Sequence, residues 1–275
     1  MMNEPQSAPS APGDQDLAAI RAQVDAIDDQ LLELVIKRSG LADQLAALKP
    51  GAAAPIRPAR EVTLLRRLIA KAETQLDAES VLDVWRSLIA GNIRRQRPIE
   101  VLVAGANSDI LRLFDLARRH FGASAKIVRA DDPRSALIRV LESPTSLAVV
   151  SYPGLTGPGA WWPIFNETRF RPLAIVSALP LMAEAGQEPE AALVAQGVTP
   201  EPAGGDFTFA VAFDPHYRIV RALNEAGLVG KELARSREAI LVRIDGFLSP
   251  ADLRIPQMVQ AGLDAFRVVG SYARI

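Results

Sequence analysis

The first part of the chain carries apolar residues at intervals that alternate between three and four residues. The series, called here the apolar seam, is Leu17, Ile20, Val24, Ile27, Leu31, Leu34, Arg38, Leu41, Leu45 and Leu48. Arg38 is its one charged member. The spacing predicts a single helix from Leu17 to Lys49, about 50 Å long at about 1.5 Å per residue. A helix of this length and period normally needs a partner helix, so we expect a homodimer through the N-terminal helices.

Two further helices are expected before residue 98. Pro58 with Glu61 predicts the start of a short helix, because proline fits a first turn and an acid suits the positive end of the helix dipole. A third helix is expected to begin near Asp77. Its one-sided series is Val81, Trp85, Leu88, Asn92 and Gln96. Residues 15–97 are therefore expected to form an all-α three-helix domain.

The pattern changes abruptly after Arg97-Pro98 and becomes α/β. Strands are expected at 99–105, 125–130, 146–154 and 173–182, and helices at 108–122 and 133–143. Residues 187–206 are rich in glycine and proline, which predicts irregular structure. Strand, helix, strand, helix and strand follow, so residues 98–205 form one expected α/β region and residues 206–275 a small α+β domain.

Composition narrows the classes of partner and chemistry. The 275 residues include 31 basic and 32 acidic side chains, for a net charge of -1, which gives no field to attract nucleic acid or an anionic membrane. There is no cysteine and there are two histidines, which disfavours thiol, haem and most zinc chemistry. Residues 1–14 form an expected disordered tail that lacks a secretory pattern, and no apolar run is long enough to span a bilayer. We expect a cytoplasmic protein without metal or cofactor.

Polar residues on apolar helix faces are the candidates for function. Arg38 and Lys49 lie eleven residues apart and therefore share a helix face, whereas Arg21 lies about 100° away and needs a second subunit to reach the same pocket. Asn92 and Gln96 interrupt the third helix. Each of these charges and amides is either an ordinary solvated or register-setting group or a part of a site.

The helix start at Arg60 and Glu61 adds one more cation and a carboxylate to this set. Taken together, the residues describe a pocket for a small dianion inside a helical bundle. The sequence shows no nucleophile with a paired base, no phosphate-binding glycine loop and no metal-ligand cluster. Catalysis in such a pocket would rest on positioning and electrostatic stabilisation.

Residues 17–96 resemble the all-helical chorismate mutases. LAAIRAQVDAIDDQLLELVIKRSGLADQLAALK is similar to the first helix of that family, PIRPARE to its loop and second-helix start, and LDAESVLDVWRSLIAGNIRRQ to its final helix. The chain departs from the family where Pro58-Ala59 replaces a frequent acid and where Asn92 replaces a serine. Enzymes of the same fold that eliminate pyruvate from isochorismate share the helical pattern.

The resemblance implies a role for each candidate. Arg21 would reach across the dimer to a substrate carboxylate, and Arg38 would bind a carboxylate in its own subunit. Lys49 and Gln96 would hydrogen-bond the ether oxygen of chorismate. Arg60 would belong to the positive lining, Glu61 would hold the substrate hydroxyl, and Asn92 would donate a hydrogen bond.

The rest of the chain resembles a shortened prephenate dehydratase followed by an ACT-like domain. IEVLVAGANSDILRLFDLARRHFG is similar to the dehydratase opening and ILVRIDGFLSPADLRIPQMVQAGLDAFRVVGSYARI to the end of an ACT domain. The dehydratases use a Thr-Arg-Phe motif late in their catalytic domain. Thr168-Arg169-Phe170 has these letters but falls earlier, just before the strand expected at 173–182, so the match is interpreted as chance.

The effector motif Glu-Ser-Arg-Pro of that family corresponds to Arg235-Ser236-Arg237, with Arg235 where an acid is expected. His216 and Tyr217 fall near its glycine turn, where bulky side chains would obstruct an amino acid.

The hypothesis is thus a chorismate mutase fused to an inactive dehydratase-derived half. The alternatives are a non-catalytic regulatory or scaffold protein of the aromatic pathway, and a bifunctional enzyme that keeps dehydratase activity through Thr168.

Overall fold

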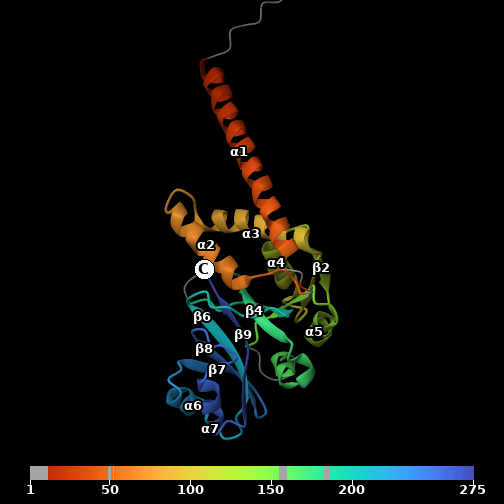
Figure 1. The fold of residues 1–275 in the computed structure, drawn as a ribbon, viewed down its shortest axis with the longest axis vertical. Helices are drawn as coiled ribbons and strands as arrows, with labels where there is room; N and C mark the ends of the chain where they lie inside the picture. Colours follow the sequence, from red (N-terminus) through yellow and green to blue (C-terminus); the bar gives the residue numbers. More distant parts are fainter. Residues whose placement is uncertain (1–11, 49–50, 52, 155–159, 183–185) are drawn as a thin grey trace, which may run out of the picture. The chain divides into compact units, whose positions relative to one another are not determined.

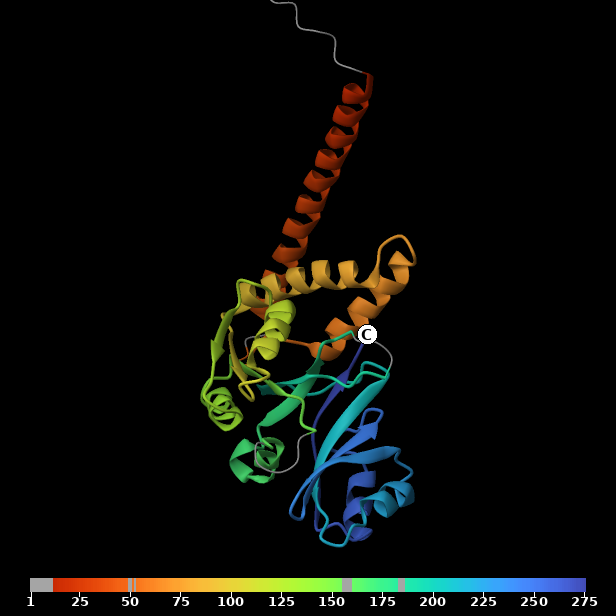
Figure 2. The ribbon, with the colours of Figure 1, turned by 180° about the vertical axis from the view of Figure 1, so that it is seen from behind.

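The computed structural model describes residues 12–48, 51, 53–154, 160–182 and 186–275. The chain divides into two units, residues 1–50 and 51–275, and each is described by itself (Figures 1 and 2). Among the described residues, no helix combines the length and apolar character needed to cross a membrane.

The described residues of the first unit form one helix, α1 (Pro12–Leu48). The single helix expected from Leu17 onward is confirmed, but it begins at Pro12, so residues 12–14 are helical rather than part of a tail. The apolar members of the seam are exposed, from 44% for Leu17 to 77% for Leu48. Lys49 lies outside the described residues.

The second unit begins with the two other expected helices, α2 (Pro58–Ala72) and α3 (Ala78–Gln96), which pack against each other. Both predicted starts are confirmed. Pro58 occupies the first turn of α2, and the Asp77 side chain caps α3 by accepting a hydrogen bond from the Ser80 N–H at 2.8 Å.

One nine-stranded sheet fills most of this unit, in the order β2-β1-β3-β5-β4-β9-β6-β8-β7. Its first part contains β1 (Glu100–Ala104), β2 (Lys126–Arg129), β3 (Ser146–Ser151), β4 (Leu173–Leu179) and β5 (Ala191–Gln196). β1 is parallel to β2 and β3, whereas β5 is antiparallel to β3 and β4. Helices α4 (Ile110–Phe121) and α5 (Pro133–Glu142) and the short η1 (Trp162–Asn166) and η2 (Thr168–Phe170) connect these strands.

The second part of the sheet is antiparallel. It contains β6 (Asp206–Phe213), β7 (Gly230–Ser236), β8 (Ala239–Asp245) and β9 (Ala265–Ala273), with α6 (Ile219–Glu225) and α7 (Arg254–Gln260). The two parts meet where Ile175 of β4 pairs with Gly270 of β9. A Cβ on Gly270 would lie 2.0 Å from the Ile175 carbonyl oxygen, so the junction requires glycine.

Helices cover both faces of the sheet. Val101 and Val103 of β1 share a core with α2, α3 and α4, whereas Leu102 and Ala104 face the core formed with α5 and η1. This double burial explains why β1 is continuously apolar. α6 and α7 pack on β6 and β8 at the end of the sheet away from α2 and α3 (Figures 1 and 2).

Arg66 of α2 hydrogen-bonds to backbone carbonyls late in the chain. Its guanidinium donates to the carbonyl oxygens of Ala203 at 3.0 Å, Gly204 at 2.6 Å and Arg274 at 2.9 Å. The last residues of the chain therefore lie beside α2 (Figures 1 and 2). α2, α3 and the sheet belong to one compact unit, residues 51–275. The domain boundaries expected at 97/98 and 205/206 stay predictions.

Two strands differ from the sequence prediction. Residues 187–206, expected to be irregular, contain β5, whose short apolar run is buried in the middle of the sheet. β7 was not predicted at all, because this edge strand is mostly polar and only Ala234 in it is fully buried. In both places pairing with neighbouring strands, rather than local sequence, decides the structure.

Candidate active site

The candidate residues of the first unit lie on α1. Arg21 is exposed, whereas Arg38 is partly buried, and this burial lowers the pKa of its guanidinium. The helix geometry places these two side chains about 100° apart, as the spacing predicts. Lys49, the third predicted cation, is outside the described part of α1.

Glu61 is the best defined candidate of the second unit. It lies in the first turn of α2 and is 9% exposed. Its carboxylate accepts a hydrogen bond from the Arg57 backbone N–H at 3.0 Å and pairs with the guanidinium of Arg86, on α3, at 2.5 Å. Arg86 is 3% exposed and also donates to the His120 carbonyl oxygen at 3.1 Å. The carboxylate is thus held in place and its charge is compensated within the chain.

Arg86 is the residue that the sequence analysis missed. It lies on one face of α3 with the buried residues Ile89, Ala90 and Ile93, whereas the predicted one-sided series was Val81, Trp85, Leu88, Asn92 and Gln96, of which Val81 is also buried. α3 has two apolar faces, and the face that packs inside this unit is the one that carries Arg86. The signal was available, since Arg86 interrupts an apolar stripe as Arg38 does.

Asn92 and Gln96 are partly buried on one side of α3, and Arg60 is exposed on α2. Around the axis of α3, Arg86 lies about 80° from Gln96 and about 120° from Asn92. Glu61 therefore contacts a different face of α3 from the face that carries the two amides. The structure brings Glu61 together with Arg86, and it leaves Asn92 and Gln96 on the neighbouring surface.

The chemistry available to these residues is binding and charge stabilisation. A carboxylate has about four acceptor positions, so Glu61 can accept a further hydrogen bond from a ligand hydroxyl. Asn92 and Gln96 carry neutral amides, and Arg21, Arg38 and Arg60 carry fixed positive charge. No group of three or more metal-ligating side chains occurs among the residues that the structure describes.

The downstream candidates have ordinary structural contacts. Thr168 and Arg169 are exposed in η2, immediately before β4, and the Arg169 guanidinium lies 4.9 Å from the Phe170 ring centroid. Arg235 on β7 pairs with Glu232 at 2.6 Å and lies 4.3 Å from the Tyr217 ring centroid. The effector motif expected at Arg235-Ser236-Arg237 stays a prediction.

A match to a known family covers the helical segment. Residues 20–97 match the family model of chorismate mutase type II. The match includes the described parts of α1 from Ile20 onward, all of α2 and all of α3, and it contains every predicted site residue from Arg21 to Gln96.

Among curated proteins, the bifunctional chorismate mutase/prephenate dehydratase of Pseudomonas aeruginosa is 30% identical over 116 residues, which are 40% of this chain and 31% of that protein. The chain therefore matches less than a third of the length of this relative.

Two solved structures are similar at a lower level. One is described as GqqA, a novel type of quorum quenching acylase, with 15% identity and a TM-score of 0.41 over 64% of this chain and 95% of its own. The other is a prephenate dehydratase from Arthrobacter aurescens in complex with L-Phe, with 15% identity and a TM-score of 0.41 over 64% of this chain and 90% of its own. Scores at this level do not establish a common fold.

Proposed function

We propose that this chain is a chorismate mutase that rearranges chorismate to prephenate. The observation that carries the proposal is the match of residues 20–97 to chorismate mutase type II, which coincides with three helices and with all seven predicted polar residues. The reaction breaks the ether C–O bond as a new C–C bond forms, and it needs no covalent intermediate, metal or cofactor. Positioned charges and hydrogen-bond donors are sufficient for such a step.

In this proposal, cations hold the two carboxylates of the substrate and a lysine and an amide stabilise the ether oxygen. Arg38 and Arg60 line the pocket of one subunit, and Arg21 comes from the partner. Lys49 and Gln96 act on the ether oxygen as negative charge develops there. Asn92 donates a further hydrogen bond, and Glu61 orients the substrate hydroxyl with the acceptor positions that Arg57 and Arg86 leave open.

The proposed assembly is a homodimer in which α1 packs against a second copy of itself. Nine apolar seam residues of α1 are exposed in the described chain, which is far more apolar surface than a stable solitary helix presents. The dimer also supplies Arg21 to the site of the other subunit.

Residues 98–205 and 206–275 are proposed to be a dehydratase-derived region and an ACT-like domain without dehydratase activity. Support comes from the position of Thr168, in a one-turn 3-10 helix before β4, and from Arg235, a cation where the effector motif has an acid. A bifunctional enzyme that uses Thr168 instead requires phenylpyruvate as a product.

The rival function is a regulatory or scaffold protein that binds chorismate without turnover. The pairing of Glu61 with Arg86 favours it, because a carboxylate already compensated by a cation contributes less to substrate recognition.

Incubation of the purified protein with chorismate, followed by NMR at neutral pH, distinguishes these proposals. Prephenate formed above the spontaneous rate supports the mutase, and phenylpyruvate formed in addition supports the bifunctional enzyme. Unchanged chorismate, together with tight binding of a transition-state analogue, favours the regulatory protein.

Gln96→Ala and Lys49→Ala test the assigned roles. Both are expected to lower kcat more than they raise KM, because the contact to the ether oxygen strengthens only as the bond breaks. Lys37→Ala removes an exposed cation of α1 off the seam and serves as the matched control. An unchanged kcat in both variants would remove these two residues from the mechanism.

A further inference from the structure

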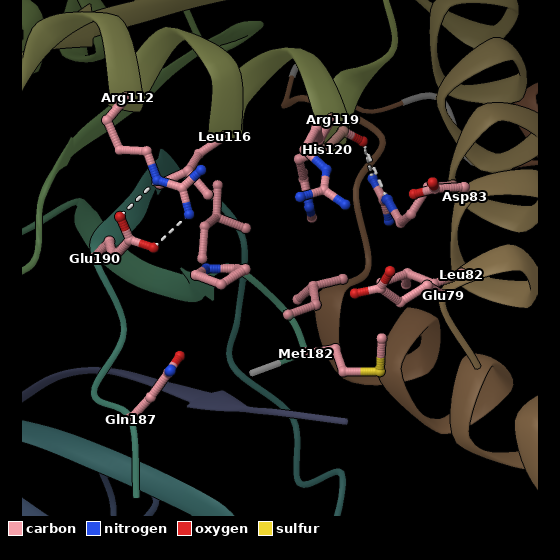
Figure 3. A pocket seen from close by; sticks show the side chains of 14 residues that line it. Glu79, Leu82, Asp83, Arg112, Leu116, Arg119, His120, Met182, Gln187 and Glu190 are labelled. Carbon is pink, nitrogen blue, oxygen red and sulfur yellow. Dashed lines mark hydrogen bonds and ion pairs between the residues drawn. The ribbon is translucent and has the colours of Figure 1, made fainter. Parts of the chain in front are cut away.

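A cavity lies in residues 51–275, and none of the seven candidate residues lines it. It has a volume of about 250 Å³ and lies between the first half of α3, one face of α4, the end of β4 and the residues Gln187 and Glu190 before β5 (Figure 3). α3 faces it with residues at helical spacing from Glu79 to Arg86, and α4 with residues from Arg112 to His120. The volume suits a ligand smaller than a typical drug molecule.

The floor of this α3–α4 pocket contains a buried histidine. His120 is 8% exposed and extends from α4 toward the cavity (Figure 3). Burial, together with the nearby charge of Arg86, holds the pKa of the imidazole well below its ordinary value, so the ring is neutral. Among the described residues, the buried side-chain nitrogens without a hydrogen-bond partner belong to Arg243 and Arg274 and not to His120, whose side chain lines the cavity. A neutral imidazole carries one hydrogen-bond donor and one acceptor, so His120 can offer both to a polar group in the cavity.

Charges of opposite sign face each other across the opening. α4 contributes Arg112 and Arg119, and α3 contributes Glu79 and Asp83. Arg112 is already held by Glu190 through two bonds of 2.6 and 2.7 Å, whereas Arg119 forms no ion pair with a described residue. Glu79 extends from α3 toward the cavity (Figure 3). The acids disfavour a simple anion, and the arginines disfavour a simple cation.

The remaining wall is apolar. It consists of Leu82, Leu116, Leu179, Pro180, Leu181 and Met182. Leu116, Leu179 and Leu181 are nearly fully buried and belong to the core shared by α3, α4 and the sheet. This surface can receive an aliphatic or aromatic group and offers it no hydrogen bond.

We propose that the α3–α4 pocket binds a small zwitterion, namely an amino acid with an apolar side chain. Its carboxylate lies toward Arg119, its ammonium group toward Glu79 and Asp83, and its side chain against the leucines and Met182. The His120 imidazole hydrogen-bonds to the polar end of the ligand. None of the seven candidate residues lines this pocket, although Arg86, the partner of Glu61, does, and the test of the pocket needs no chorismate.

Titration calorimetry of the full chain tests the chemical class of the ligand. The probes are L-leucine, L-methionine and L-phenylalanine, and for each the amine that lacks the carboxylate and the acid that lacks the ammonium group. At least one amino acid is expected to bind saturably, and both of its analogues at least about tenfold more weakly. No saturable binding at millimolar concentration, or equal binding of either analogue, would overturn the proposal.

Variants locate the binding. Arg119→Gln and Glu79→Gln are each expected to weaken the affinity at least about tenfold, because each removes one of the two charges that select a zwitterion. Arg118→Gln, the exposed neighbour of Arg119 outside the pocket, is expected to leave the affinity unchanged. Unchanged affinity in both pocket variants would place the amino acid elsewhere in the chain and refute the site.

Discussion

Arg38 on α1 and Arg86 on α3 both interrupt apolar faces, but only Arg86 has a carboxylate partner among the described residues. Arg86 is 3% exposed and is neutralised by Glu61, a carboxylate of the same unit. Arg38 is partly buried, and desolvation lowers the pKa of its guanidinium without a carboxylate among the described residues to oppose the effect. A buried cation with an internal partner is a structural element, whereas a desolvated cation without one is available to an anionic ligand.

The largest expected effect follows from breaking the internal pair. Arg86→Met should lower the free energy of unfolding by about 3–5 kcal/mol, because Glu61 would remain buried without its cation. The double variant Arg86→Met with Glu61→Gln should regain most of the lost free energy of unfolding. Urea unfolding followed by tryptophan fluorescence measures both. A cost below about 1 kcal/mol for the single variant would mean that the pair is not a structural element.

Arg38→Leu should act on catalysis instead of stability. We expect kcat/KM for chorismate to fall about 10²–10³-fold, the range observed when one preorganised donor is removed from a charged transition state. The helix content should not decrease, since leucine suits the apolar seam. Steady-state kinetics and circular dichroism measure the two quantities, with Lys37→Ala as control. Full activity in Arg38→Leu would show that Arg38, like Arg86, does not bind the substrate.

A charge on the seam itself should weaken the proposed dimer. Ile27→Asp is expected to raise the dissociation constant about 100-fold, because it desolvates a carboxylate between two helices. Gln30→Asp, an exposed position of α1 outside the seam, should have little effect. Sedimentation equilibrium measures the assembly. If the wild-type chain is monomeric, or if both variants dissociate alike, α1 does not form the dimer interface.

The smallest effect is expected at a partly exposed pair that serves as the reference for the buried pair of Arg86 and Glu61. Arg254 donates to the Asp252 carboxylate at 2.8 Å and lowers the pKa of Asp252 to about 2. Because the folded pKa is depressed, the pair stabilises the fold at neutral pH, and this contribution is lost as the pH falls from about 4 to about 2. Solvent screening limits it to less than about 1 kcal/mol.

Arg254→Met should raise the pKa of Asp252 toward 3.8, its ordinary value, with little change in stability at pH 7. An NMR pH titration of the Asp252 carboxyl measures the shift. A loss of several kcal/mol at neutral pH would remove the distinction between exposed and buried pairs on which this comparison depends.

The sequence predicted most elements because their signals are local. Pro58 and Asp77 marked the starts of α2 and α3, and the seam marked α1. β5 and β7 were missed because one is defined by central burial and the other by edge pairing, both of which depend on residues far along the chain.

The same limit applies to the candidate site. Arg38 and Glu61 could be singled out from spacing and from the helix start. The pairing of Glu61 with Arg86 could not, because it joins residues 25 positions apart through the packing of α2 on α3. Gln96 and Asn92 could be assigned to one face, but spacing alone did not identify which of the two apolar faces of α3 is buried.

The three carbonyl oxygens held by Arg66 have a consequence for the order of folding during synthesis. The bond from Arg66 to Arg274 spans 208 residues, so α2 completes its contacts only after residue 274 has left the ribosome. Contacts of such long range slow folding and leave apolar surface uncovered in the meantime. α2, which carries Arg60 and Glu61 of the proposed site, is therefore made well before the chain end that completes its contacts.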